Sequence, residues 1–277
     1  MLHRAIALVM LCSIACGSDD PVDGIPTVYG GDRPVSLQIP LFTEGQVYPL
    51  VLILHGYGAS GFVQEAYFGL DDLVERGTAF VLAPDGLVDS MSRQFWNADD
   101  TCCDFDNQNP DDVAYLGGLV DEVMADWPID PKRVRIIGHS NGGFMAYRLA
   151  CDRADLFTSI VSLAGNAASV TCQPSEPVHV LHIHGTADAT VPFTGAAPSV
   201  DEWATRNSCS ATGTPAGTFD LDAAILGAET SAATRDGCAA GGTVEQWTMT
   251  DSGHIPNLTR EFDTAISQWW ADHPRPD

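Results

Sequence analysis

One ten-residue segment constrains the fold of this chain more than any other. Residues 135–144 read RIIGHSNGGF, an apolar run that meets a glycine, presents Ser140 and passes through two more glycines into an amphipathic stretch. This order predicts a strand, a sharp turn and a helix. Glycine on either side of the serine lets the backbones approach closely, so that the hydroxyl projects above a sheet. We therefore predict that Ser140 is a nucleophile.

Apolar runs and helical patterns alternate along the rest of the chain. We expect an edge strand at 35–39, buried strands at 47–54, 78–83, 134–137, 159–164, 178–183 and 243–250, and helices at 60–76, 113–126, 141–151 and 259–272. Residues 190–242, rich in Ala, Gly and Thr, predict a surface excursion with one short helix near 199–207. The alternation predicts the α/β class, with a mostly parallel, doubly wound sheet and helices on both faces. Residues 165–177 are too few to build a helical cap, so we expect no lid domain.

The amino-terminal residues predict export. Residues 1–15 combine an early Arg, an apolar run and small residues, which is typical of a signal peptide. Cys16 follows and resembles the lipidated cysteine of a bacterial lipobox, so we expect a lipid anchor to a bacterial membrane; ordinary secretion is the alternative. Residues 16–34, rich in Gly, Asp and Pro, predict a flexible tether, and residues 35–277 the catalytic domain.

Six further cysteines suit an exported chain, because an even number favours disulfides. We expect Cys209 to pair with Cys238, since that bond would close the irregular excursion. By elimination, the pair of adjacent cysteines would then bond to the remaining two, in an order that the sequence leaves open: Cys102, Cys103, Cys151 and Cys172. Their spacing is not that of structural zinc sites, and no metal is predicted.

The chain is strongly acidic, with 37 acids against 13 bases and a net charge of −24. Such a field repels nucleic acid and polyanionic substrates, so we expect no nucleic-acid partner. We interpret the charge as a solvated surface that keeps the protein soluble, and we expect a monomer.

An acid-rich loop at 99–112 raises the question of calcium. Asp104 and Asp106 begin like an EF-hand loop, but Gln108 and Asn109 stand where that loop needs an acid or Asn and a glycine. A calcium site of another type stays open. The simpler interpretation is a polar loop whose last acids favour the amino end of the next helix.

Two further residues complete a catalytic set with Ser140. Asp188 and His254 each follow a predicted strand, and the order Ser, Asp, His is that of the α/β-hydrolase fold. His254 would accept the Ser140 proton, and Asp188 would orient His254 and stabilise its charged form. Asp251 shares the loop of His254 and is the weaker candidate for the acid. We interpret His182 and His184 as structural residues rather than metal ligands.

The remaining site residues are predicted from loops near the serine. The backbone N–H groups of Tyr57 and Asn141 would bind the oxyanion, because the HGYG loop at 55–58 ends a central strand. The long loop at 87–110 would form one wall of the cleft, with Trp96 and Tyr57 contacting substrate. The alternative for Trp96 is that it plugs the loop onto the core.

The chain resembles a known family in a set of short motifs. These are HGYG at 55–58, APDG at 83–86, WN at 96–97, the Cys102-Cys103 pair, DDV at 111–113, GHSNGG at 138–143, RLAC at 148–151, HGTAD at 184–188 and GH at 253–254. They look like those of secreted esterases grouped as polyhydroxybutyrate depolymerase-like and feruloyl-esterase-like. The resemblance implies hydrolysis of carboxylic esters by Ser140, Asp188 and His254 without a metal or organic cofactor. Where the family usually has Trp-Pro after the histidine, this chain has Ile255-Pro256, which makes Ile255 a substrate-binding candidate.

Our leading hypothesis is therefore a serine esterase that acts on bulky or polymer-linked esters, such as feruloyl or acetyl esters of polysaccharide. The alternatives are a polyhydroxyalkanoate or polyester depolymerase, a serine peptidase, and a binding lipoprotein without catalysis.

Overall fold

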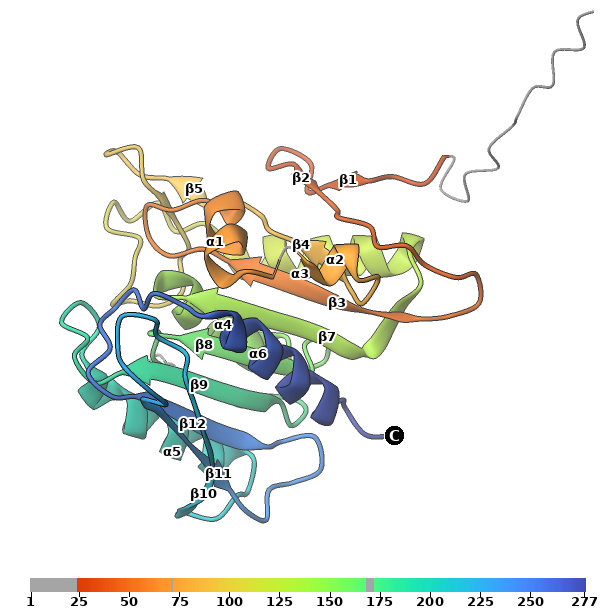
Figure 1. Ribbon diagram of the computed structural model, residues 1–277. Helices are drawn as coiled ribbons and strands as arrows, with labels where there is room; N and C mark the ends of the chain where they lie inside the picture. Colours follow the sequence, from red (N-terminus) through yellow and green to blue (C-terminus); the bar gives the residue numbers. More distant parts are fainter. Residues whose placement is uncertain (1–23, 71, 168–171) are drawn as a thin grey trace, which may run out of the picture.

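A single large sheet organises the molecule. The computed structural model describes residues 24–70, 72–167 and 172–277 (Figure 1). Eight strands lie in the order β10-β11-β12-β9-β8-β7-β3-β4. The predicted signal peptide and Cys16 lie outside the described residues. Within the described ranges, every helix is too short or too polar to cross a membrane.

The elements alternate as the sequence predicts. The strands are β1 (Val28–Tyr29), β2 (Val35–Ser36), β3 (Tyr48–Leu54), β4 (Phe80–Leu82), β5 (Leu87–Val88), β6 (Gln94–Phe95), β7 (Ile129–His139), β8 (Ser159–Leu163), β9 (His179–Gly185), β10 (Gly213–Phe219), β11 (Thr230–Arg235) and β12 (Val244–Met249). The helices are α1 (Gly61–Phe68), α2 (Asp72–Glu75), α3 (Asp112–Asp126), α4 (Asn141–Asp152), α5 (Ala196–Arg206) and α6 (Arg260–Asp272), with a 3₁₀ turn η1 (Phe193–Gly195).

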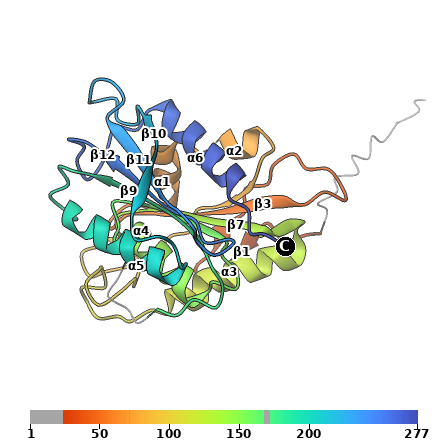
Figure 2. The same ribbon diagram turned by 90° about the horizontal axis from the view of Figure 1, so that it is seen from below.

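Helices cover both faces of the sheet, as predicted (Figure 2). Strands β4, β3, β7, β8, β9 and β12 run parallel. Alternate side chains of β7 enter opposite layers: Ile136 packs with α3, α4 and α5, whereas Ile137 packs with α1 and α6. Strands buried on both faces need continuous apolar runs, which explains why they were recognisable in the sequence.

The excursion predicted at 190–242 is wrong in part, because two of its segments extend the sheet. β10 pairs with β11 and β11 with β12, both antiparallel. Nearly every residue of β10 is exposed. The strand is held by its ladder hydrogen bonds rather than by burial, so it lacks the apolar alternation that marks a half-buried strand.

The single helix predicted at 60–76 is also wrong. Gly69 adopts a left-handed conformation (φ 65°) and ends α1, and a short α2 follows. A single helix over 60–76 would place Phe62 on its apolar side, but Phe62 is 79 % exposed. The apolar periodicity came from two segments on either side of a turn.

The tether predicted at 16–34 is wrong for its described part. Tyr29 is only 6 % exposed, and its hydroxyl donates to Asp126 Oδ2 (3.0 Å) and accepts from Trp127 Nε1 (2.8 Å). Arg33 forms an ion pair with Asp112 (2.7 Å). The folded unit therefore includes residues before 35. The buried side chain of Tyr29 holds this segment against the domain, although its Gly and Pro content predicts a flexible tether. The predicted edge strand at 35–39 is confirmed in part: β2 pairs with β1, and Gln38 alone reaches the main sheet, where it forms an antiparallel bridge with Val81 of the edge strand β4.

The structure contains three disulfides among the described residues. Cys209–Cys238 is confirmed and joins the loops before β10 and after β11. The pairing by elimination is wrong: Cys102 bonds to its neighbour Cys103. Cys151 at the end of α4 bonds to Cys172, with their Cα atoms 5.5 Å apart. The elimination assumes that a disulfide links segments that are distant in the sequence. The bond between the adjacent residues Cys102 and Cys103 does not follow that assumption.

We expect the Cys209→Ser/Cys238→Ser variant to lose about 2–4 kcal/mol of unfolding free energy, because the bond closes a loop of 29 residues in the unfolded chain. Urea unfolding measures this, with the Cys209→Ser single variant as the control for a free thiol. An unchanged midpoint in the double variant would contradict the prediction.

Candidate active site

Three predicted side chains meet above the carboxyl ends of β7, β9 and β12. His254 Nε2 lies 2.9 Å from Ser140 Oγ, and His254 Nδ1 lies 2.7 Å from Asp188 Oδ2. The side chain of Asp188 is fully buried, whereas that of His254 is partly exposed. In neutral His254 this arrangement leaves Nδ1 protonated toward the carboxylate and Nε2 free to accept the serine proton.

Close backbone contacts hold the serine in its turn. Ser140 has a positive φ of 53°, and its N–H donates to Leu163 O of β8 (2.8 Å). A Cβ at Gly138 would collide with the carbonyl of Gly142, and a Cβ at Gly142 with the carbonyl of Leu54 in β3. The two glycines are therefore required to seat α4 against the sheet and to expose the serine.

Asp188 accepts several hydrogen bonds besides that of His254. The backbone N–H groups of Thr190 and Val191 donate to Oδ1 (2.8 and 2.9 Å). Asp251 lies on an exposed turn after β12, and its backbone N–H donates to Thr186 Oγ1. The geometry thus joins His254 to the acid that we expected.

A buried chain of side chains, which sequence reasoning missed, continues behind Asp188. His184 Nε2 lies 3.3 Å from Asp188 Oδ2 and 2.9 Å from Val191 O. His184 Nδ1 lies 3.1 Å from His182 Nε2, and His182 Nδ1 lies 2.8 Å from the Tyr147 hydroxyl. Burial lowers the pKa of both histidines, so both are neutral at pH 7.

The protonated ring nitrogens of His182 and His184 can be assigned, starting from the contacts of His184 with Asp188 and Val191. Both partners of His184 Nε2 are acceptors, so this nitrogen carries the proton and Nδ1 accepts from His182. His182 Nδ1 then accepts from the hydroxyl of Tyr147. The donors all point toward Asp188, which stabilises its negative charge. The available sequence signal was the alternation of His182 with His184, the first residue of the HGTAD motif.

His139, the residue before the serine, supports His254 directly. Its Nε2 lies 2.9 Å from the backbone carbonyl of His254 and donates to it. Burial lowers the pKa of His139 to about 4, and this residue is therefore neutral at pH 7. The sequence pattern predicts no role for His139, because the residue occupies a variable position of the serine motif.

The loop of Tyr57 lies beside the serine. A Cβ at Gly56 would be 3.4 Å from Ser140 Cβ and 3.1 Å from His139 Nδ1. Asn141 is the first residue of α4, so its N–H has no acceptor within the helix. These positions keep the two backbone N–H groups of Tyr57 and Asn141 as candidates for the oxyanion hole.

The Asn141 side chain has a structural task that the sequence did not indicate. It is fully buried; its Oδ1 accepts from Trp96 N (2.7 Å) and its Nδ2 donates to Trp96 O (2.9 Å). These reciprocal bonds fix the 87–110 loop to the serine turn. Trp96 itself is completely buried, and its Nε1 donates to His55 O (3.1 Å). Its predicted contact with substrate is therefore wrong, and the alternative role in the core is correct.

A cavity of about 580 Å³ opens next to Ser140. Tyr57 and Phe105 meet edge to face in its wall (centroids 5.2 Å apart). The other apolar lining residues come from the loop of the Cys102–Cys103 disulfide, from α4 and α5, and from the segments after β8 and β9: Cys102, Cys103, Phe144, Ala167, Val191, Pro192 and Pro198. Ile255 is 68 % exposed and does not line this cavity, so its contact with substrate stays a prediction.

The acids of the 99–112 loop bind the protein itself. Asp104 accepts from the N–H groups of Gln108 and Asn109, and Asp106 from Ser90. Asp111 caps α3. Within residues 24–70, 72–167 and 172–277, no three His, Cys, Asp or Glu side chains converge in a way that could hold a metal ion.

Comparison with known proteins gives consistent relatives. Residues 43–209 match the phospholipase/carboxylesterase family. The putative esterase NocK of Nocardia uniformis is 34 % identical over 158 residues, 56 % of this chain and 44 % of its own length. The probable feruloyl esterase C of Aspergillus niger is 29 % identical over 222 residues, 75 % of this chain and 76 % of its own. The chain thus spans less than half of NocK.

Solved structures share the fold. An acetyl xylan esterase from Aspergillus awamori superposes with a TM-score of 0.62 at 15 % identity, covering 86 % of this chain and 93 % of that one. The Bacillus cereus carboxylesterase gives 0.59 at 18 % identity, with the same shares. These likenesses confirm the predicted α/β-hydrolase fold.

The burial of His139 predicts a pH effect on stability. Between pH 6.5 and about 4 the unfolded chain binds a proton at this residue that the folded protein excludes. The unfolding free energy should therefore fall as the pH falls, by about 1.4 kcal/mol per pH unit for this residue. In His139→Gln, whose amide can still donate to the His254 carbonyl, the slope should be shallower by that amount. Urea unfolding from pH 8.5 to 4 tests this; the two profiles should run parallel above pH 7.5, and equal slopes below pH 6.5 would disprove the assignment.

Proposed function

The chain belongs to the phospholipase/carboxylesterase family and is a carboxylic ester hydrolase, and we propose that it works through a Ser140–His254–Asp188 triad on bulky or polymer-linked esters. The observation that carries the proposal is the placement of His254 between Ser140 Oγ and Asp188 Oδ2 at the edge of an apolar cavity.

The proposed reaction has two halves. His254 Nε2 takes the proton of Ser140 as Oγ attacks the ester carbonyl, and the backbone N–H groups of Tyr57 and Asn141 stabilise the oxyanion. Collapse of the tetrahedral intermediate returns the proton to the leaving alcohol and leaves an acyl-enzyme. His254 then activates water, which releases the acid. Asp188 keeps the imidazole in the required tautomer and stabilises its charged form.

The cavity supports an acyl or alcohol group with an apolar ring. Its walls are mostly apolar, and the edge-to-face pair of Tyr57 and Phe105 offers aromatic contact. The described residues between β8 and β9 form no helix above it, which leaves room for a polymer chain. Feruloyl and acetyl esters of polysaccharide, the substrates that the names of the relatives suggest, fit these properties.

The compartment belongs to the same proposal. Three disulfides favour an oxidising environment outside the cytoplasm. We place the protein in the cell envelope or the medium, with the lipid anchor at Cys16 and the monomeric state as parts of the proposal.

Ser140→Ala should lower kcat/KM by at least about a thousandfold, because the mutant lacks the nucleophile. The measurement is turnover of p-nitrophenyl acetate, p-nitrophenyl butyrate, methyl ferulate and emulsified polyhydroxybutyrate. Loss of methyl ferulate turnover supports the aromatic ester; activity confined to polyhydroxybutyrate would favour a polyester depolymerase instead. Equal rates in mutant and wild type would disprove the triad.

Asp188→Asn should lower kcat by at least about a thousandfold, because an amide stabilises the wrong His254 tautomer and supplies no charge. The matched control is Asp251→Asn, the other acid near His254 in sequence, which should stay within about twofold of wild type. Circular dichroism of both variants checks folding. The reverse pattern would show that Asp251 is the orienting acid.

A further inference from the structure

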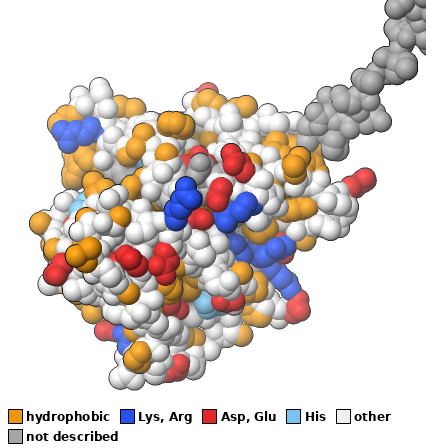
Figure 3. Space-filling view, viewed as in Figure 1, with side chains coloured by type: hydrophobic (Ala, Val, Ile, Leu, Met, Phe, Trp, Pro, Cys, Tyr) orange, Lys and Arg blue, Asp and Glu red, His pale blue; other side chains and the backbone are white. Residues whose placement is uncertain are grey.

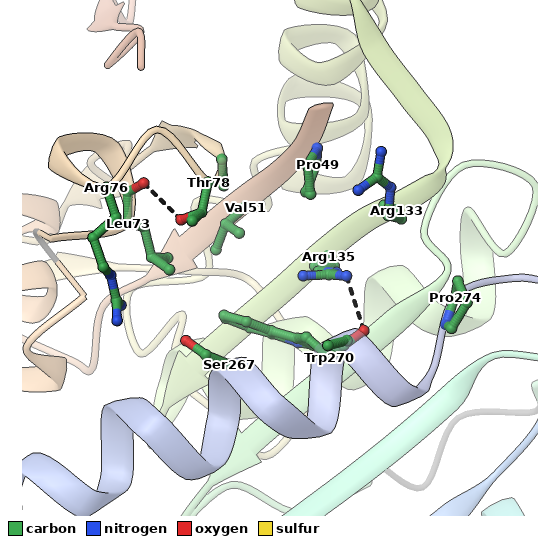
Figure 4. Close-up of a pocket in the computed structure, with 12 residues that line it drawn as sticks. Pro49, Val51, Leu73, Arg76, Thr78, Arg133, Arg135, Ser267, Trp270 and Pro274 are labelled. Carbon is green, nitrogen blue, oxygen red and sulfur yellow. Dashed lines mark hydrogen bonds between the residues drawn. The ribbon is translucent and has the colours of Figure 1, made fainter. Parts of the chain in front are cut away.

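A second cavity lies toward the amino ends of the central strands, whereas Ser140 lies beyond the carboxyl end of β7. It encloses about 530 Å³ between β3, β7 and the carboxyl-terminal half of α6 (Figure 4). Most of its walls are apolar: Pro49, Val51, Leu73, Ala79, Trp270 and Pro274. Arg135 of β7 also lines this cavity. Ser140 follows five residues later, just beyond the end of β7, and five residues span roughly 16 Å along a strand. We call this cavity the Arg135 pocket.

Arg135 occupies a position where the sheet needs an apolar residue. It shares a face of β7 with Ile137, which packs under α6, and it is only 8 % exposed. Its Nη2 donates to the Trp270 carbonyl (2.8 Å), while its Nε has no hydrogen-bond partner. A buried guanidinium with an unused N–H is costly in free energy.

This arginine also lacks an acidic partner. Two neighbouring arginines of the pocket are paired, Arg76 with Asp72 and Asp263, and Arg133 with Asp130. No ion pair of the described residues includes Arg135. Burial lowers its pKa to about 10, so it remains charged at pH 7. The carbonyl end of α6 offers only a partial negative charge.

Arg135 is the one of the three arginines in the pocket that has no ion pair with a described residue. Arg76 and Arg133 also line the pocket, but three carboxylates neutralise them. Figure 3 shows Lys and Arg side chains among Asp and Glu side chains on the face on which α6 lies. The attraction for an anion therefore comes from Arg135 itself, while the net charge of −24 disfavours anions that carry many charges.

From this combination we propose that the Arg135 pocket binds a small monocarboxylate with an aromatic or short apolar body. The carboxylate would accept hydrogen bonds from the Nη1 and remaining Nη2 N–H groups of Arg135, since only one Nη2 hydrogen bond, to the Trp270 carbonyl, is formed within the described part of the protein. The apolar body would pack between Val51 and Trp270. A cavity of this volume is within the usual range for small-molecule sites.

Calorimetric titration of the Ser140→Ala protein with benzoate and cinnamate tests the proposal without turnover. We expect one-to-one binding of each acid, at least about tenfold weaker binding in Ser140→Ala/Arg135→Met, and none of benzamide, the neutral analogue. Phe105→Ala, which alters the cavity beside Ser140, should leave the affinity unchanged and so locates the site. Because no ester is cleaved, the result is independent of the proposed triad.

A second variant keeps Arg135 and removes the space. Ala271 lines the pocket from the exposed side of α6, so Ala271→Phe is expected to fold and to abolish binding. It decides the question if Arg135→Met fails to fold. Equal affinity for benzoate and benzamide, unchanged affinity in either pocket variant, or loss of binding in Phe105→Ala would overturn the proposal.

Discussion

The close packing of α4 against β7 and β3 is the contact on which the site depends. Gly142 touches the Leu54 carbonyl and Gly138 touches Gly142, so a single added methyl group would separate the helix from the sheet. The same contact places Asn141 at the amino end of α4 and lets its side chain hold the backbone of Trp96. One turn therefore positions the proposed nucleophile, a candidate oxyanion donor and one wall of the cavity, which explains why so short a motif predicts several features of the site.

Residues whose environment is set by regular periodicity were predictable. The continuous apolar runs of β3 and β9 and the strand-end positions of Asp188 and His254 follow from the rules of parallel sheets. What failed depended on tertiary contacts with no local pattern. Examples are the seating of Tyr29 against Trp127, the exposed ladder of β10 and the burial of Trp96 behind Asn141. A tryptophan in a long loop can contact a ligand or pack into the core, and the sequence pattern is the same in both cases. Only the tertiary packing distinguishes the two roles.

The polar groups that contact the Asp188 carboxylate point N–H donors at it and so stabilise its negative charge. The carboxylate is fully buried, yet it accepts from two backbone N–H groups, from His254 and from the end of the His182–His184 chain. A buried charge that is satisfied in this way needs no lysine or arginine beside it. In the proposed reaction, protonation of His254 would place an ion pair beside hydrogen-bond donors that already stabilise the carboxylate of Asp188. This arrangement also suits a chain in which basic residues are scarce.

Arg135 is the opposite case on the same strand. Asp188 is buried with its acceptors filled, whereas Arg135 is buried with one hydrogen bond to a helix carbonyl, a contact with the face of the Trp270 ring and a buried Nε that has no hydrogen-bond partner among the described residues. Apolar substitution would relieve an unpaired charge, so stability alone does not explain an arginine at this position. A ligand that supplies the missing carboxylate would account for both the charge and the cavity. β7 would then carry a reactive serine beyond its carboxyl end and an anion receptor nearer its amino end, on a sheet whose rigidity keeps the two apart.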